Sequence, residues 1–218
     1  MNRRRSNRAK PRQTSPGKGS RHAASHRGSG GELRIIGGAH RSRRLPVLQS
    51  PGLRPTPDRV RETLFNWLAF ELPGRRVLDL YAGTGALGLE ALSRGVAEAV
   101  FVESQAPVAT AIEENLARLH LDAQVVRDEV ARYLEKAPRP FDLVFLDPPF
   151  RQGLAASTCE QLERLGWLSE GALIYVESEP MLEWSPPANW SLHREVRAGD
   201  SHGRLFRRLA AGRDDDAR

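Results

Sequence analysis

The sequence predicts an α/β fold in which helices cover both faces of a mostly parallel sheet of about seven strands. Two observations support this prediction. Short apolar runs alternate with helical patterns from Arg76 onward, and the run Leu143–Asp147 lacks polar alternation. Strands that alternate with helices form parallel sheets, and strands covered on both faces are apolar throughout. With 218 residues, 39% of them apolar, one domain with an ordinary core is expected.

An N-terminal extension is expected over residues 31–73. Leu33–Ile36 and Leu45–Leu48 predict short strands around a basic turn that contains two glycines. Thr56-Pro57-Asp58 predicts a helix start, because a hydroxyl cap, a proline at the first helical position and an early acid all favour one. Apolar residues follow at helical spacing: Val60, Leu64, Trp67 and Leu68.

The main domain is expected over residues 74–210. The expected strands are Val77–Leu80, Ala99–Glu103, Gln124–Arg127, Leu143–Asp147 and Leu173–Glu177. The expected helices are Ala86–Ser93, Pro107–Leu119, Val130–Lys136 and Leu154–Leu165. Leu192–Arg197 and Arg204–Leu209 predict a C-terminal antiparallel hairpin, because a Gly/Asp/Ser/His turn separates them.

Charge is divided unevenly along the chain, whose formal net charge is +6. Residues 1–30 carry nine Lys/Arg and no acid, residues 31–66 carry a net +4, and residues 67–218 a net −7. Residues 1–30 lack large aliphatic side chains after Met1, so we expect a disordered basic tail there, and a short flexible tail at 211–218. A basic end on an acidic domain predicts a polyanionic partner, and a tail that only aids solubility is the alternative.

Composition also excludes several classes of protein. The single cysteine, Cys159, cannot supply a disulfide framework or a thiolate metal cage, and the six histidines lack metal-ligand spacing, so no metal is expected. No apolar run approaches the roughly 20 residues that span a bilayer. The basic N-terminus lacks the apolar stretch of a secretory signal. We therefore expect a cytoplasmic, monomeric protein without membrane contact.

A glycine-rich loop between the strand Val77–Leu80 and the next helix predicts a nucleotide-like ligand. Gly83, Gly85 and Gly88 have the G-x-G-x-x-G spacing, and Glu103 ends the next strand, 20 residues after Gly83. Glycine lets the backbone approach a ligand closely, and the acid can accept hydrogen bonds from ribose hydroxyls. A tight structural turn beside a surface acid is the alternative.

Asp79 separates the two ligand classes that such a loop serves. Its carboxylate would repel the pyrophosphate of a nicotinamide cofactor, which favours bare helix N–H groups. The same carboxylate suits the cationic amine and sulfonium of S-adenosylmethionine. The string Asp79-Leu-Tyr81-Ala-Gly83-Thr-Gly85 resembles the first motif of class I methyltransferases, which implies a Rossmann-like fold and places these four residues at the cofactor.

In that superfamily an acid after the third strand commonly binds the adenine amino group of the cofactor. The chain has two acids there, Asp128 and Glu129. The usual position lies four residues before an aromatic residue, which is Tyr133 here, so the spacing selects Glu129, where an aspartate is usual. Which of the two acids contacts adenine stays open.

Asp147-Pro148-Pro149-Phe150 directly follows the fourth strand, at the sheet edge where ligands of parallel sheets bind. Prolines fix an extended backbone and lack an N–H, so their carbonyls can face a ligand. The Asp147 carboxylate and the Pro148 carbonyl would accept the two hydrogens of a planar amino group while Phe150 stacks on its ring. This positioning favours in-line methyl transfer to the nitrogen without a metal or a covalent intermediate.

The tetrapeptide resembles the fourth motif of amino-group methyltransferases, which act on adenine, cytosine, guanine or glutamine amides. Over residues 32–209 the chain resembles the RsmD family, bacterial small-subunit ribosomal RNA guanine methyltransferases. The strings that carry this resemblance are Leu33–Gly38, Gly52–Leu68, Gly83–Gly95, Asp147–Phe150 and Ala172–Ser178. The resemblance implies methylation of the exocyclic 2-amino group of one guanine in small-subunit rRNA, free or within an assembling 30S particle.

Basic residues of the extension predict a surface for that RNA. Seven arginines lie on or beside the expected hairpin and helix: Arg34, Arg41, Arg43, Arg44, Arg54, Arg59 and Arg61. Arginine can neutralise phosphates and stack on bases, so we predict that this cluster contacts RNA, although each residue alone could be a solvated charge.

Three other functions share some of these features. A DNA adenine or protein glutamine methyltransferase would share the tetrapeptide, but it would need a target-recognition domain or a peptide groove, and the chain has no spare segment of that size. A non-catalytic RNA-binding protein of the same fold would not need Asp147, Gly83 and Glu103 to be intact. A nicotinamide-dependent oxidoreductase is disfavoured by Asp79.

Overall fold

The computed structural model of the protein describes residues 31–48, 58–180 and 184–210. Several predictions lie outside the described residues: the basic tail 1–30, the tail 211–218, Arg54 and the Thr56-Pro57 helix cap. Within the described part, no helix combines the length and the apolar character that crossing a membrane would require.

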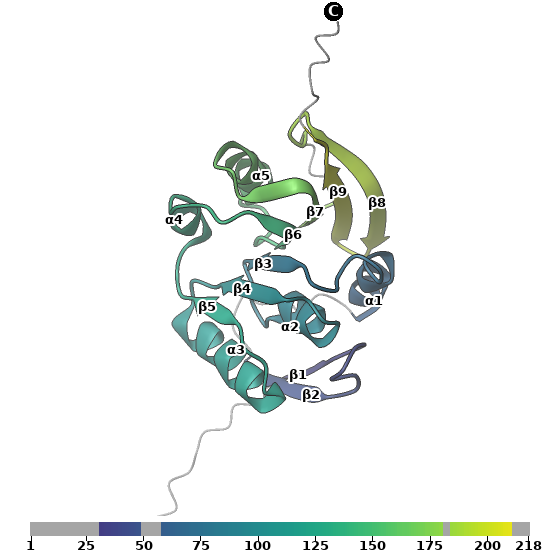
Figure 1. Ribbon diagram of the computed structural model, residues 1–218, viewed down its shortest axis with the longest axis vertical. Coiled ribbons are helices and arrows are strands. Elements are labelled where there is room, and N and C mark those ends of the chain that lie inside the picture. The colour runs from purple at the N-terminus through teal and green to yellow at the C-terminus, as the bar shows by residue number, and fades with distance from the viewer. Residues whose placement is uncertain (1–30, 49–57, 181–183, 211–218) are drawn as a thin grey trace, which may run out of the picture.

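Five strands of the main sheet are parallel: β3 (Arg76–Leu80), β4 (Glu98–Val102), β5 (Gln124–Val126), β6 (Phe141–Leu146) and β7 (Leu168–Ser178). β8 (Trp190–Ala198) and β9 (Ser201–Arg208) form the predicted antiparallel hairpin. The sheet order is β5-β4-β3-β6-β7-β9-β8, with β9 antiparallel to both of its neighbours (Figure 1). The predicted sheet is confirmed, and its order reverses between β3 and β6, where ligands of such sheets bind.

Helices cover both faces of this sheet, as predicted. The helices are α1 (Asp58–Trp67), α2 (Ala86–Ser93), α3 (Ala106–Leu119), α4 (Val130–Leu134) and α5 (Leu154–Arg164). Successive strand residues point to opposite faces, so Val77 packs in the core formed with α1, α2 and α3, while Leu78 packs in the core formed with α4 and α5 (Figure 1). These two cores make the sheet the middle layer of the domain.

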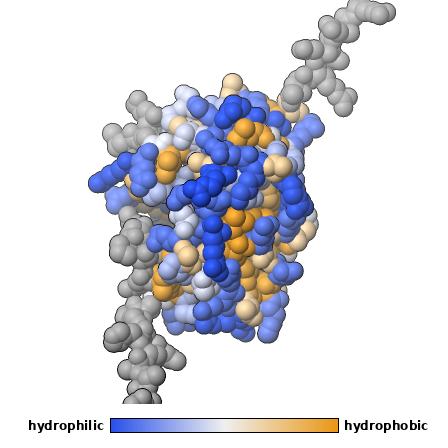
Figure 2. All heavy atoms as spheres, turned by 90° about the vertical axis from the view of Figure 1, so that its left-hand side faces the viewer, coloured by the Kyte–Doolittle hydropathy of each residue, from blue (hydrophilic) through white to orange (hydrophobic). Residues whose placement is uncertain are grey.

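The open edge of the sheet at β5 is short. Only Gln124, Val125 and Val126 form this strand, and the two valines are half-buried. Figure 2 shows the face that carries α3, β5 and α4: it is mostly hydrophilic, with a strip of hydrophobic residues near its middle. A three-residue edge offers few unpaired backbone groups to another strand, which limits unwanted pairing.

The extension contributes a separate two-stranded sheet, formed by β1 (Gly31–Arg34) and β2 (Arg44–Val47). The sequence placed the first strand at Leu33–Ile36, and the observed strand ends two residues earlier. Ile35 still donates its N–H to the carbonyl of Arg43 at 2.9 Å, but the N–H groups of Ile36 and Gly37 donate to the carboxylate of Glu90 in α2 at 2.7 and 2.8 Å. Backbone donors that are directed into a helix cannot pair with a neighbouring strand.

The turn between β1 and β2 is hydrogen-bonded to Ser93, the last residue of α2. The N–H of Ala39 donates to the carbonyl of Ser93 at 2.7 Å, and the N–H of His40 donates to its hydroxyl oxygen at 3.0 Å. Gly38 directly precedes these two residues with a φ of +77°, and a Cβ there would lie 1.8 Å from the Ser93 carbonyl oxygen. Only glycine therefore permits this contact between the extension and α2.

Gly38→Ala should destabilise the protein by more than backbone strain alone, and Gly74→Ala is the matched control. Gly74 has the same φ of +77° but nothing within 4 Å of a Cβ, so its replacement measures the left-handed strain, about 1–2 kcal/mol. Gly38→Ala also displaces the turn from α2, and we expect a total loss of at least about 3 kcal/mol in the free energy of unfolding. Urea unfolding measures both variants. Equal losses would show that the turn is not held against Ser93.

Candidate active site

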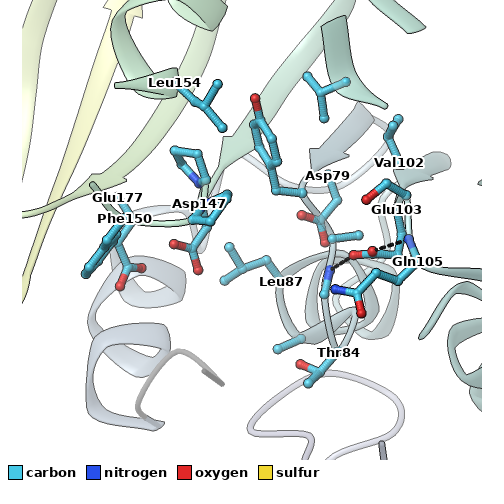
Figure 3. Close-up of a pocket in the computed structure, with 18 of the residues that line it drawn as sticks. Asp79, Thr84, Leu87, Val102, Glu103, Gln105, Asp147, Phe150, Leu154 and Glu177 are labelled. Carbon is cyan, nitrogen blue, oxygen red and sulfur yellow. Dashed lines mark hydrogen bonds between the residues drawn. The ribbon is translucent and has the colours of Figure 1, made fainter. Parts of the chain in front are cut away.

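A pocket of about 660 Å³ opens at the carboxyl ends of the parallel strands (Figure 3). Every parallel strand supplies at least one carboxylate to its lining: Asp79 from β3, Glu103 from β4, Asp128 and Glu129 from β5, Asp147 from β6, and Glu177 from β7. None of the described lining residues is Lys, Arg or His. In the described part of the chain, no group of three or more His, Cys, Asp or Glu could hold a metal ion. The lining therefore favours an organic cation and disfavours phosphate.

The loop between β3 and α2 presents backbone to the pocket, as the glycine motif predicts. Gly83 and Gly85 have φ values of +53° and +74°, a left-handed conformation that glycine adopts without strain. The N–H of Gly85 donates to the carbonyl of Ala82 at 2.7 Å and closes the turn. Tyr81 also has a positive φ, +59°, and its hydroxyl is hydrogen-bonded to Thr158 at 3.0 Å. This bond to α5 holds a strained residue in place beside the pocket.

Glu103 is fixed by the backbone on two sides. Its carboxylate accepts the N–H of Gly83 at 2.9 Å and the N–H of Gln105 at 2.8 Å, drawn as dashed lines in Figure 3. A carboxylate can accept about four hydrogen bonds, so these two leave capacity for ribose hydroxyls. The bond from Gly83 also connects Glu103, which follows β4, to the glycine loop, which follows β3.

Asp79 lies buried beneath the loop, where its carboxylate accepts the N–H of Gly88 at 2.9 Å. Burial raises the pKa of Asp79 to about 8; the Gly88 hydrogen bond acts in the opposite direction, and the charge of Glu103 raises the pKa further. The carboxyl group is therefore mostly protonated at neutral pH while no cation faces it.

Asp128 and Glu129 both line the pocket but differ in their contacts. The carboxylate of Asp128 accepts a hydrogen bond from Lys136 at 2.8 Å and the N–H of Glu129 at 3.0 Å, and Arg132 lies at 3.4 Å. The bond to Lys136 is the main cause that lowers the pKa of Asp128. Glu129 is exposed, and its carboxylate has no hydrogen bond or ion pair to another described residue. More acceptor capacity is thus left on Glu129, the acid that the spacing selected.

The tetrapeptide Asp147–Phe150 continues β6 into the pocket. Its first proline, Pro148, is buried, Pro149 is exposed and Phe150 is half-buried, and all four residues line the pocket. Figure 3 shows Asp147 and Phe150 on one side of the pocket and Glu103 on the other. The arrangement therefore places the predicted amine holder opposite the predicted cofactor residues.

Two lining residues that the sequence analysis did not assign to the site adjoin this tetrapeptide. Glu177, at the end of β7, is 3% exposed, and its carboxylate accepts hydrogen bonds from the hydroxyls of Tyr175, at 3.2 Å, and Ser201. Glu177 could have been found, because it ends a predicted buried strand as Asp147 does. Ser201 could not, because no local pattern indicates that β9 inserts between β7 and β8.

The arginines predicted to contact RNA separate into exposed and buried residues. Five are exposed: Arg34, Arg41, Arg43, Arg44 and Arg59. The prediction is wrong for Arg61, which is 1% exposed and donates to the carbonyl of Arg34 at 3.1 Å and to Asp58 at 2.6 Å. Its guanidinium connects α1 to β1 and cannot reach a phosphate from this position.

Comparisons with known proteins show which family and which fold this chain shares. The family model described as conserved hypothetical protein 95 matches residues 33–207. Ribosomal RNA small subunit methyltransferase D of Escherichia coli K12 is 52% identical over 196 residues, which are 87% of this chain and 96% of that protein. The solved E. coli protein yhhF, a candidate methyltransferase, has a TM-score of 0.77 at 49% identity and covers 83% of this chain and 100% of its own.

A more distant solved structure shares the fold alone. It is a T. thermophilus 16S rRNA guanine-N2 methyltransferase in complex with AdoMet and guanosine, with a TM-score of 0.63 at 22% identity. The likeness covers 83% of this chain and 50% of that one.

Asp79→Asn should remove a pH dependence of stability. The unfolded chain releases the Asp79 proton near its ordinary pKa of 3.8, whereas the folded protein keeps it up to about pH 8. Folding therefore becomes less favourable as the pH rises through this window, by up to about 1.4 kcal/mol per pH unit. We expect the unfolding free energy of the wild type, relative to Asp79→Asn, to fall from about pH 4 to about pH 8 and then level off. Urea unfolding across this range tests it, and parallel curves would contradict the raised pKa.

Proposed function

We propose a function for this chain on the basis of its family and its pocket. The chain belongs to the ribosomal RNA small subunit methyltransferase D family. Its fold is that of class I methyltransferases, as the glycine motif predicts. The proposed activity is methyl transfer from S-adenosylmethionine to the exocyclic 2-amino group of one guanine in small-subunit rRNA. The observation that carries this proposal is the position of Asp147–Phe150 in a pocket whose charged lining residues are all acidic.

The residues present fit S-adenosylmethionine, which supplies a methyl group on a positively charged sulfur. The acidic lining favours a cation and disfavours the phosphates of a nicotinamide cofactor, and Asp79 can give up its proton when a cation faces it. Glu103 has acceptor capacity for ribose hydroxyls, and Glu129 has it for the adenine amino group. Gly83 lines the pocket without a side chain and lets a ligand approach the backbone, whereas the missing Cβ of Gly85 makes room for Ile112 and Leu89. The AdoMet in the T. thermophilus structure supports this assignment.

The acceptor side of the pocket would hold the amine that receives the methyl group. The Asp147 carboxylate and the Pro148 carbonyl can each accept one hydrogen of the amino group, while the Phe150 ring stacks on the base. Holding both hydrogens directs the nitrogen lone pair across the pocket, toward the side where Glu103 lies. Most of the rate acceleration then comes from this positioning.

The RNA would contact both the pocket and the extension, which meet opposite ends of the buried helix α2. The glycine loop precedes the first residue of α2, and the basic β1–β2 turn contacts its last residue, Ser93. Eight helical residues separate the two, a distance of about 12 Å. Exposed Arg41 and Arg43 in the turn could contact phosphates while a base enters the pocket. We propose that the protein acts as a monomer on small-subunit rRNA, free or in an assembling particle.

Mass mapping of methylated nucleosides tests the proposed function. Small-subunit rRNA is compared between a strain that lacks this gene, its parent, and the deletion strain that again expresses the full chain. We expect a single guanine to lose its N2-methyl group in the deletion strain and to regain it on expression. An unchanged set of methylated nucleosides, or a change at another kind of base, would overturn the proposal.

Asp147→Ala should separate cofactor binding from chemistry. Calorimetry should show unchanged affinity for S-adenosylmethionine, whereas single-turnover methylation should slow by at least about 100-fold, because the amine is no longer held (about 2.7 kcal/mol of barrier). Asp142→Asn is the matched control: Asp142 lies on the same strand but accepts the N–H of Arg76 at 2.9 Å, outside the pocket lining. A rate for Asp147→Ala within about threefold of the wild type would contradict this role.

A further inference from the structure

We infer that Glu177 accepts the N1–H of the target base and thereby selects guanine among the groups that carry an exocyclic amine. This inference rests on the proposed function, because it takes Asp147 and Pro148 as the holder of the amino group. It adds a residue that determines base specificity.

Strand register places Glu177 beside Asp147. β6 and β7 are parallel neighbours, and Leu146 pairs with Val176, so the next residue of each strand, Asp147 and Glu177, occupies an equivalent position. Adjacent strands lie about 4.8 Å apart, and side chains at equivalent positions point to the same face. Figure 3 shows both carboxylates on the same side of the pocket, close to Phe150. A base stacked on that ring would therefore present one edge to two neighbouring carboxylates.

Hydroxyl donors position both oxygens of the Glu177 carboxylate. One oxygen accepts the hydroxyl of Tyr175 at 3.2 Å and the other accepts the hydroxyl of Ser201. Burial, together with the charges of Glu177 and Asp147, raises the pKa of Tyr175 well above its ordinary value, so its hydroxyl stays a donor. A carboxylate offers about four acceptor sites, and each of the two hydroxyls occupies one of them. Because Glu177 lines the pocket, its carboxylate is placed to accept a donor from a ligand as well.

Only guanine presents a donor next to the amino group. Its N1–H adjoins the 2-amino group, whereas the amine of adenine adjoins the N1 acceptor, that of cytosine adjoins the N3 acceptor, and that of a glutamine amide adjoins a carbonyl oxygen. A second carboxylate beside the amine holder therefore gains a hydrogen bond from guanine. With the other three it would face a lone pair and lose free energy through repulsion and desolvation. Glu177 thus explains a preference for guanine over these three groups, which the tetrapeptide alone does not explain.

Base analogues test this inference in the wild-type protein. Small-subunit rRNA is prepared with guanine, 6-thioguanine or 2-aminopurine at the mapped position, in whichever form, free or assembled, the unmodified RNA is methylated. 6-Thioguanine keeps the N1–H, whereas 2-aminopurine keeps the 2-amino group but presents a lone pair at N1. We expect kcat/KM for 6-thioguanine within about tenfold of guanine, and for 2-aminopurine lower by at least about 100-fold.

Glu177→Gln should shrink this preference, because the amide can donate to N1 of 2-aminopurine. We expect the ratio of kcat/KM for guanine over 2-aminopurine to fall below about tenfold, with unchanged affinity for S-adenosylmethionine. Glu163→Gln is the matched control: Glu163 is likewise held by neighbours, among them Trp190 at 2.9 Å and Arg208 at 2.8 Å, but it does not line the pocket. This variant should keep the wild-type ratio.

Two outcomes would overturn the role of Glu177. One is wild-type protein that methylates 2-aminopurine within about threefold of guanine, a result that needs no variant to fold. The other is a Glu177→Gln protein that binds S-adenosylmethionine normally and keeps the full preference for guanine. A wild-type protein that forms no N2-methylguanine on the guanine RNA would instead overturn the proposed function, and with it this inference.

Discussion

Helix α2 packs closer to the sheet than a side chain at its third residue would allow, and two other parts of the molecule depend on that contact. A Cβ on Gly88 would lie 2.2 Å from the ring of Phe101 and 3.0 Å from the carboxylate of Asp79. All eight residues of α2 are buried. The glycine loop leads into one end of this helix, while Glu90 and Ser93 hold the β1–β2 turn. A change that lifted α2 would therefore disturb the glycine loop beside the pocket and the β1–β2 extension together.

The carboxylates of the pocket are stabilised mostly by neutral donors. Backbone N–H groups serve Asp79 and Glu103, and hydroxyls serve Glu177. Neutral donors offset part of the cost of burying a carboxylate but supply no positive charge. The raised pKa of Asp79 records what remains of that cost. The pocket thus gains from a cationic ligand and disfavours phosphates, so under the proposed function the RNA backbone would stay outside it.

Local patterns predicted the fold and much of the candidate site. The site positions of Asp79, Glu103 and Asp147, at or just after the ends of their strands, could be predicted because apolar runs, a glycine motif and a proline pair lie beside them in the sequence. The errors and omissions depend on contacts between distant segments. Arg61 has the charge of an RNA ligand, and only the packing of α1 against β1 buries it. Glu177 lies beside Asp147 in the pocket because β6 and β7 pair in register, and these two strands are far apart in the sequence.

The insertion of β9 between β7 and β8 has a consequence for synthesis of the protein. The edge of β7 that later pairs with β9 stays unpaired until the last strand has been translated, and an unpaired edge is prone to aggregation. Ser201, the first residue of β9, is also the residue that completes the hydrogen bonds of Glu177. The glycine loop and the Asp147 tetrapeptide precede β9 in the chain, but the hydrogen bonds of Glu177 are complete only once β9 has been translated. A nascent chain that stops before β9 therefore lacks part of the pocket around Glu177.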